Sequence, residues 1–163
     1  MKLATLRDLY VEQLQDLYSA ETQIVEALPK MAKAASHAQL RQAFEQHLTE
    51  TEHQVQRLET IFKQLEIKPG GTTCKGMQGL LKEGDEMVAA KGEPSAIDAG
   101  LIAAAQRVEH YEIAGYGCVR TYARLLGETE AAALLQQTLD EEGTADHKLT
   151  ELAEAAINVE AEG

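Results

Sequence analysis

Val108-Glu109-His110-Tyr111-Glu112 places two carboxylates inside an apolar helical stripe. The stripe advances by alternating steps of three and four residues, which keeps its members on one face of an α-helix. Its members are Ile102, Ala105, Glu109, Glu112, Tyr116, Val119, Ala123 and Leu126. A buried carboxylate without a partner costs several kcal/mol or takes up a proton. The pattern therefore requires something that stabilises Glu109 and Glu112, and a metal ion is the leading candidate.

Three other apolar stripes, over residues 10–31, 40–65 and 135–156, are also interrupted near their middles. The interrupting residues are Glu21 in the first stripe, His47, Thr51 and Gln54 in the second, and Glu142 and Asp146 in the third. Glu50 lies on the flank of the second stripe, close to one turn after His47. The sequence thus predicts four long helices, each with a polar break near its middle.

Capping signals indicate where these helices begin and end. Three pairs resemble capping boxes at helix N-termini, namely Thr5 with Asp8, Ser36 with Gln39 and Ser95 with Asp98. The stretch Lys68-Pro69-Gly70-Gly71 and the glycine Gly127 are typical of helix ends, and the last helix is expected to begin near Thr129. Inside the third helix, Gly115 and Gly117 are interpreted as sites of close helix packing.

Residues 68–95 form a different kind of segment, in which two Gly/Pro-rich patches bracket a short amphipathic piece. A four-helix bundle with a long connection between its second and third helices has such an element. The chain contains only 3 Pro, 2 Phe and 5 Tyr, and Ala, Leu, Glu and Gln dominate its composition. We therefore predict one all-α domain over residues 1–163, a four-helix bundle with a short helix in its crossover.

Composition also limits the classes of function. The formal net charge is −12, from 15 basic and 27 acidic residues, which disfavours nucleic-acid binding. Cys74 and Cys118 are too few for a disulfide scaffold and are expected to be reduced thiols. No signal peptide or apolar run of transmembrane length is recognised, so we expect a cytoplasmic protein without a membrane partner.

Packing the four helices as a bundle would bring their polar breaks to one region of the core. The candidate metal ligands are Glu21, His47, Glu50, Glu109, Glu112, Glu142 and Asp146. Carboxylates three or four residues apart on a helix can hold two ions separated by about 3.5–4 Å. Two divalent ions would offset much of the charge of six carboxylates. Oxygen-rich ligation with one imidazole suits iron best, with manganese as the alternative, and zinc less well.

Simpler interpretations stay open for individual residues. A single Glu on an apolar face is commonly an edge residue that reaches solvent, and His47 could be a hydrogen-bonded core histidine. His53, His110 and His147 lie off the apolar faces and are expected to be solvated. Tyr116, one turn beyond Glu112, is either a hydrogen-bond donor to the site or an ordinary core tyrosine.

The chain resembles the YciF/YciE-type stress proteins, a bacterial ferritin-like family, over nearly its whole length. The matching segments are 16–21, 27–30, 47–51, 101–114, 139–142 and 145–146, of which 101–114 (Leu-Ile-Ala-Ala-Ala-Gln-Arg-Val-Glu-His-Tyr-Glu-Ile-Ala) is the most specific. The resemblance implies a ferritin-like bundle with a two-metal carboxylate site, a homodimer and a link to bacterial stress. Within the rubrerythrin-like pattern, Glu21 matches the single carboxylate of the first helix, and Glu109 with Glu112 matches the ExxE pair of the third.

Two departures from that pattern stand out. The second helix contains Glu50-xx-His53, but the phase of the stripe favours His47 as the inward imidazole. In the fourth helix the expected histidine position is Asp146, with His147 one residue out of phase. No CxxC pairs of a rubredoxin-like module occur, so an electron donor would be another protein or a small reductant.

Three functions are compatible with these features. The first is a di-iron oxidoreductase that reacts with peroxide or oxygen under stress. The second is iron binding or storage without turnover, which needs a large hollow assembly. The third is a metal-free structural or interaction bundle, whose thermal midpoint would not depend on a chelator.

Overall fold

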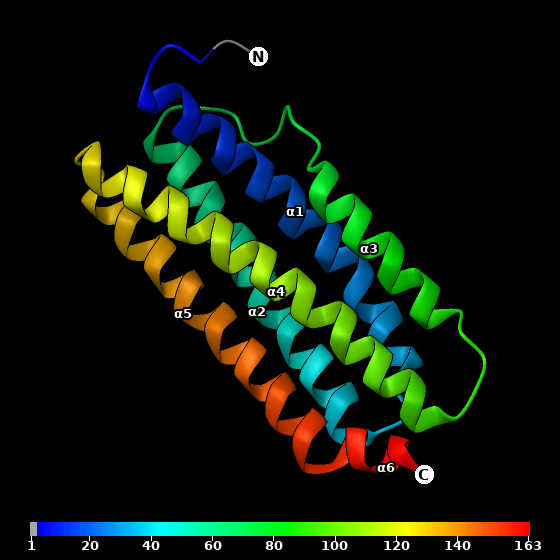
Figure 1. Ribbon diagram of the computed structural model, residues 1–163. Coiled ribbons are helices and arrows are strands. Elements are labelled where there is room, and N and C mark those ends of the chain that lie inside the picture. The colour runs from blue at the N-terminus through cyan, green and yellow to red at the C-terminus, as the bar shows by residue number, and fades with distance from the viewer. Residues whose placement is uncertain (1–2) are drawn as a thin grey trace.

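Four long helices form the body of the molecule, and shorter helical segments follow the second and the last of them (Figure 1). The computed structural model describes residues 3–163, and regular structure in that range is helical. The helices are α1 (Leu6–Ala34), α2 (Ala38–Gln64), α3 (Lys75–Val88), α4 (Pro94–Leu125) and α5 (Thr129–Leu152). A π-helical turn (Ala153–Ile157) and α6 (Asn158–Glu162) follow α5. The predicted all-α bundle with a helix in its crossover is confirmed.

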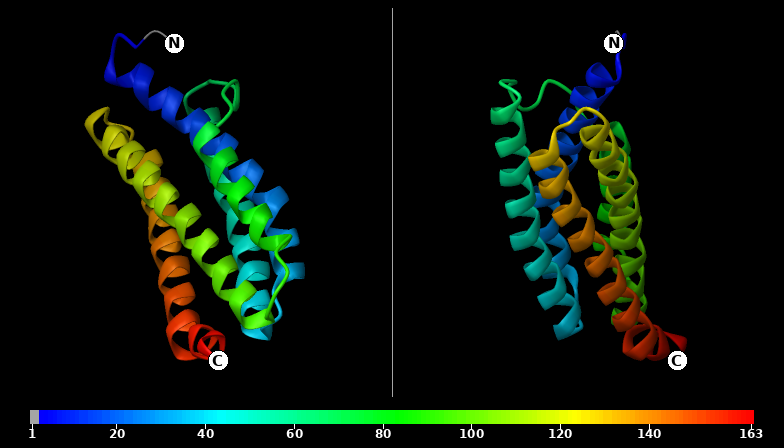
Figure 2. Two further views of the ribbon diagram at one scale, coloured as in Figure 1. Left: turned by 45° about the vertical axis from the view of Figure 1, so that its right-hand side comes forward. Right: turned by 90° about the vertical axis from the view of Figure 1, so that its left-hand side faces the viewer.

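The four long helices surround a common interior. Helix α1 packs against α2 and α4, and α5 packs against the same two helices, so each long helix has two long neighbours. Helix α3 lies outside this ring, against α1 and α4 (Figure 2). The crossover therefore covers one outer face of the bundle, where Met77 of α3 joins the core.

The interior has an apolar cluster on either side of a polar middle layer. The first, which we call the Phe44 cluster, includes Ile24, Leu28, Met31, Leu40, Phe44, Leu101, Ile102 and Leu149. The second, the Phe62 cluster, includes Tyr10, Leu14, Leu17, Leu58, Ile61, Phe62, Val119 and Leu135. Each long helix contributes to both clusters, so its polar break lies between them.

Two of the predicted helix boundaries are confirmed in detail. Thr5 and Asp8 form a reciprocal capping box at the start of α1. Gly127, with φ of 77°, lies beyond the end of α4, where its N–H and that of Glu128 donate to carbonyls of the last turn. These bonds, at 3.2 and 2.9 Å, make a Schellman motif, which requires a residue such as glycine at positive φ.

The capping boxes predicted at Ser36 and Ser95 are wrong, and one residue explains both. The carboxylate of Asp98, on α4, accepts the backbone N–H groups of Ser36 and His37 at 2.9 and 2.8 Å. It therefore caps α2 from across the bundle instead of capping its own helix. Asp98 is only 2% exposed, so this cap is part of the core.

The predicted end of α2 at the Gly/Pro patch is also wrong by several residues. The helix ends at Gln64, and Glu66 adopts a left-handed φ of 56°. The N–H of Ile67 donates to the Phe62 carbonyl at 3.0 Å, which stops the helix as a glycine would. Non-glycine residues adopt this conformation rarely, so its sequence signal is weak.

Gly115 and Gly117, both inside α4, have different surroundings. A Cβ on Gly115 would lie 2.8 Å from Cδ2 of Leu17 on α1, so the predicted close packing is confirmed there. A Cβ on Gly117 would meet no atom within 4 Å, so the same interpretation is wrong for Gly117.

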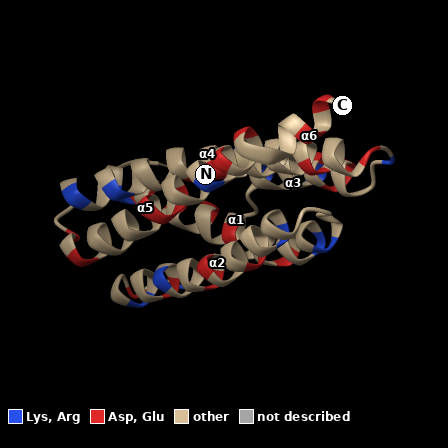
Figure 3. Cartoon of the chain, turned by 90° about the horizontal axis from the view of Figure 1, so that it is seen from below, with Lys and Arg blue, Asp and Glu red and all other residues tan. Residues whose placement is uncertain are grey.

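Charged residues lie along the outer faces of the helices, and acidic ones outnumber basic ones (Figure 3). Cys74 and Cys118 are both free thiols, as expected. None of the helices in the described part of the chain has the length and hydropathy that crossing a membrane requires.

Candidate metal centre

The polar breaks of the four long helices meet in the layer between the two apolar clusters. Helix α4 supplies Glu109 and Glu112, which are one turn apart and therefore share its inner face. Helix α2 supplies His47, α5 supplies Glu142 and α1 supplies Glu21. All five are buried, because each occupies a position in an otherwise apolar stripe.

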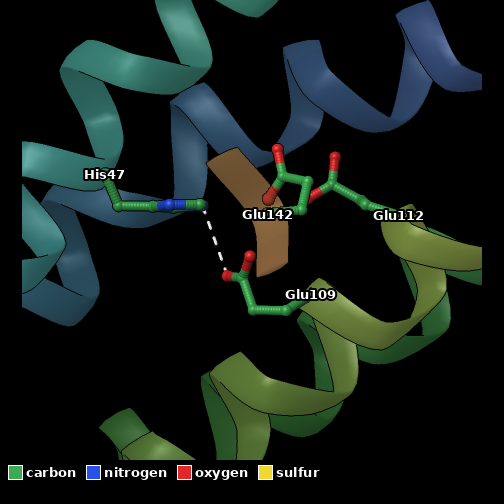
Figure 4. A group of neighbouring side chains, drawn as sticks. All are labelled: His47, Glu109, Glu112 and Glu142. Carbon is green, nitrogen blue, oxygen red and sulfur yellow. Dashed lines mark ion pairs between the residues drawn. The ribbon is translucent and has the colours of Figure 1, made fainter. Parts of the chain in front are cut away.

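Four of these side chains form a compact group. His47, Glu109, Glu112 and Glu142 each place one potential ligand atom within 4.8 Å of the others. Figure 4 shows His47 pointing across the interior toward Glu109, with Glu112 beside Glu142. Nε2 of His47 lies 3.3 Å from Oε1 of Glu109. A single cation could therefore be contacted from three helices at once.

Glu21 lies next to this group and is held by Tyr116. The Tyr116 hydroxyl donates a hydrogen bond to Oε1 of Glu21. Of the two interpretations of Tyr116, the structure supports the donor to the site. The other oxygen of Glu21 has no hydrogen-bond partner. Glu21 is thus oriented by one bond and retains an oxygen for a further contact.

Burial sets the protonation states that this layer would have without a cation. Desolvation, followed by the charge of Glu142, raises the pKa of Glu21 and of Glu109 well above the usual range. Desolvation and the Glu21 charge raise the pKa of Glu112 in the same direction. Burial raises the pKa of Glu142 to about 7. At neutral pH several of these acids would therefore hold protons.

His47 is also neutral under these conditions, because desolvation, with a smaller contribution from Lys148, lowers its pKa to about 4. A neutral imidazole beside a protonated carboxyl is not an ion pair, so the contact between His47 and Glu109 supplies little charge compensation. A neutral imidazole is, however, the form that ligates metals.

Buried atoms without hydrogen-bond partners are concentrated in this layer. Nine such atoms lie there among the described residues: Glu21 Oε2, His47 Nδ1 and Nε2, Gln54 Oε1, Glu109 Oε2, and both carboxylate oxygens of Glu112 and of Glu142. A buried polar group left unsatisfied costs about 1–3 kcal/mol. Metal coordination would satisfy several of these atoms together, and four carboxylates with one imidazole suit iron or manganese. The residues present therefore fit a metal centre.

A hydrogen-bond network supports the group from the α2–α5 side. Arg57 donates to both oxygens of Glu141, at 2.6 and 2.7 Å, and also to Thr138 at 3.1 Å. Nε2 of Gln54 donates to Glu141 at 3.2 Å. Gln54 is buried, so the network runs from a partly exposed ion pair into the polar middle layer.

Besides Glu21, two more of the seven predicted site residues lie outside the group. Glu50 is half-buried on the flank of α2 and accepts a hydrogen bond from Gln46 at 2.9 Å. Asp146 is half-buried one turn beyond Glu142, where Gln106 donates to it at 3.0 Å and His110 lies 3.3 Å away. A spacing of four residues exceeds one turn by about 40° around the helix, which moves Asp146 toward the edge of the inner face.

The histidines are distributed as expected. His47 is buried, whereas His53, His110 and His147 are exposed. Arg57, Glu141 and Thr138 were missed as supporting residues. Arg57 follows Gln54 by three residues, which places it on the same side of α2, but nothing local indicates its partner on α5.

Comparisons with known proteins extend over nearly the whole chain. The domain of unknown function DUF892 matches residues 5–162. Protein YciF of Escherichia coli K12 is 44% identical over 163 residues, covering 99% of this chain and 98% of that protein. The crystal structure of the E. coli stress protein YciF matches with a TM-score of 0.92 and 43% identity, covering 96% of this chain and 99% of that one.

Two further solved structures are similar. YcfI from Rhodopseudomonas palustris, which is proposed to be a structural protein, has a TM-score of 0.88 and 42% identity, covering 91% of this chain and 95% of that one. A Xanthomonas campestris protein has a TM-score of 0.77 at 23% identity and covers 97% of each chain, which extends the likeness of fold alone.

Proposed function

Since this chain is a member of the DUF892 family together with the stress protein YciF, we propose that it is a metal-binding stress protein with a two-metal carboxylate centre. The proposed ligands are Glu21, His47, Glu109, Glu112 and Glu142, with Glu50 and Asp146 flanking them. The observation that carries the proposal is the concentration of partnerless buried oxygen and nitrogen atoms in one layer. Iron is the proposed metal, with manganese as the alternative.

The arrangement of the ligands supports a pair of ions better than one. Glu109 and Glu112 share a face of α4, and Glu142 and Glu21 approach from α5 and α1. Four carboxylates offer eight oxygens, of which six have no partner. Two divalent ions would balance four negative charges, whereas one would leave half of that charge in a buried layer.

The first experiment measures metal content. Protein purified without chelators is expected to carry about two iron or manganese ions per chain, measured by mass spectrometry of the element. Glu109→Ala should lose most of the metal. Glu130→Ala, which removes an exposed carboxylate of α5, is the matched control and should retain it. Equal metal content in both variants, or none in the wild-type chain, contradicts the proposal.

We further propose that the iron-loaded protein reduces peroxide or oxygen. The metal would supply electrons, and the chain would supply the surroundings of the reaction. Tyr116 holds Glu21 by a hydrogen bond, and the Phe44 and Phe62 clusters exclude bulk water. Mixing the Fe(II) protein with peroxide under anaerobic conditions should oxidise the iron at least ten times faster than free Fe(II). An equal rate removes the redox part of the proposal and leaves metal binding intact.

Two other functions are separated by simple measurements. Iron storage needs a hollow assembly, which light scattering would detect as a particle far larger than the homodimer we expect. A structural role without metal is favoured by the description of YcfI. It predicts a chain that binds no metal and has the same thermal midpoint with and without a chelator.

A further inference from the structure

The buried group is not sealed equally on all sides. Glu21, Glu112 and Glu142 are 0% exposed, whereas His47 retains 7% and Glu109 retains 2%. The two side chains that remain slightly accessible are also the two whose nearest ligand atoms are 3.3 Å apart. Access to the group, where it exists, is therefore on the side of the His47–Glu109 pair.

A cavity lies on that side, and both residues line it. Its apolar wall comes from all four long helices and consists of Leu28, Ala43, Phe44, Ala105, Ala145 and Leu149. Its polar lining beyond the pair consists of Gln46, Glu50 and Lys148. Gln46 is exposed, and Glu50 and Lys148 are half-buried, so these three residues mark the outer end of the cavity.

The dimensions of the cavity limit what can pass. The space open to a water-sized sphere is about 30 Å³. Because one water molecule needs at least about 10–15 Å³ measured in this way, the cavity has room for about two waters. A molecule of two heavy atoms fits this space, and a branched organic molecule does not unless the wall residues move. An apolar wall of this kind also disfavours a fully hydrated ion over an uncharged molecule.

We propose that this cavity is the passage by which an uncharged molecule of about two heavy atoms reaches the metal centre at its His47–Glu109 side. The inference rests on the proposed metal function and adds a route and a size limit to it: hydrogen peroxide and dioxygen pass, and an organic hydroperoxide does not. It also gives Glu50 a different place from the one its sequence position indicates. Glu50 lies with Lys148 at the outer end of the passage and not among the ligands.

The alanines of the wall offer a way to close the passage without touching a ligand. Ala145 on α5 is half-buried and lines the cavity. Ala145→Leu adds three carbon atoms, which would fill most of a space that holds about two waters. Ala43→Leu does the same from α2 and serves as an independent variant. Ala133→Leu makes the matched change at an exposed position of α5 that does not line this cavity.

Nitric oxide is a suitable probe, because it is uncharged, has two heavy atoms and binds Fe(II). Its association with the anaerobic Fe(II) protein would be followed by stopped-flow absorption, after iron content and thermal midpoint have been measured for each variant. Ala145→Leu and Ala43→Leu should bind nitric oxide at least ten times more slowly than the wild-type chain while retaining its iron. Ala133→Leu should match the wild-type rate. In the wild-type chain, tert-butyl hydroperoxide should oxidise the iron at least ten times more slowly than hydrogen peroxide.

The outcomes separate the two proposals. Unchanged nitric oxide rates in both wall variants, with iron bound, would overturn the passage and leave the metal centre standing. Equal rates with the two peroxides would overturn the size limit. A wild-type chain that takes up no iron would overturn the proposed function and the passage together.

Discussion

The same four helices supply the polar middle layer and most of the two apolar clusters beside it, and the residues of all three regions are buried to a similar extent. In the Phe44 and Phe62 clusters, each buried side chain removes apolar surface from water and stabilises the fold. In the middle layer, desolvated carboxylates face one another and leave oxygens without partners. Burial there opposes folding, and a bound cation is one way to offset that cost.

The largest expected loss of stability comes from a substitution in an apolar cluster. Phe62 is 0% exposed and its ring meets Tyr18 edge-on, with centroids 5.8 Å apart. Phe62→Ala should lower the free energy of unfolding by about 3–5 kcal/mol, because it removes buried area and leaves a cavity. Denaturant unfolding in the presence of a chelator would measure this loss. A loss below about 1 kcal/mol would mean that the Phe62 cluster is not a packed core.

The second effect concerns pH and distinguishes the middle layer from the clusters. The folded pKa of Glu142 is about 7, above its ordinary value of 4.5, so the folded state binds more protons between these values. The contribution of Glu142 to the stability of the metal-free protein should therefore be fully present below pH 4.5 and be lost as the pH rises to about 7. The contribution is on the order of 3 kcal/mol, and the raised pKa values of Glu21, Glu109 and Glu112 act in the same direction.

Urea unfolding in a chelator at pH 5 and pH 7.5 would test this sign. Glu142→Gln is the control, since it removes the titrating group and should reduce the change in the free energy of unfolding between these two pH values. A metal-free protein that becomes more stable toward pH 7.5 would contradict the assigned burial of these acids.

A smaller loss of stability is expected from a change at the connection between α1 and α2. Asp98→Ala removes the acceptor of two backbone N–H groups and leaves Ser36 and His37 without their cap. The expected loss is about 2 kcal/mol, because charged acceptors at a helix N-terminus contribute more than neutral ones. Thermal unfolding would detect it as a lower midpoint. Asp98→Asn, which retains an acceptor oxygen, should lose less, and equal losses would mean that the charge contributes nothing.

The smallest expected effect is a gain in stability. Gly117→Ala should stabilise the protein by about 0.5–1 kcal/mol, because alanine favours a helix and its Cβ meets no atom. Gly115→Ala forces Leu17 to move and should give less or become a loss. The difference in midpoint between the two variants tests whether α1 and α4 approach closely at Gly115 alone.

The stripes predicted most of the interior because helical periodicity is local. Glu21, Glu109 and Glu112 occupy the inward phase in the sequence, and they are buried in the structure. Glu50 and Asp146 are only half-buried, although Asp146 was assigned to the stripe of its helix. Three residues along a helix rotate a side chain by about 60° from its predecessor, and four residues by about 40°, so both lie near the edge of the inner face. At that margin the hydrogen-bond partners determine which way the side chains turn: Gln46 for Glu50 and Gln106 for Asp146. Gln106 is 40 residues from Asp146 in the chain, so local sequence does not reveal it.

The cap of α2 could not be predicted from local sequence. Asp98 follows Ser95 by three residues and so imitates a capping box for its own helix. Its true partners, Ser36 and His37, are 62 and 61 residues away and reach it only when the bundle is assembled. Local signals describe helix ends well where the cap is local, as at Thr5 and Gly127.

The thermal midpoints of the wild-type chain and of Glu112→Leu, each measured with Fe(II) and with a chelator, test most directly whether the middle layer is built for cations. We expect metal to raise the wild-type midpoint in proportion to the logarithm of its free concentration. Glu112→Leu should gain nothing from metal, and in the chelator it should be the more stable protein by about 1–2 kcal/mol. A wild-type midpoint that is the same under both conditions, together with a variant that is less stable in the chelator, would contradict the account.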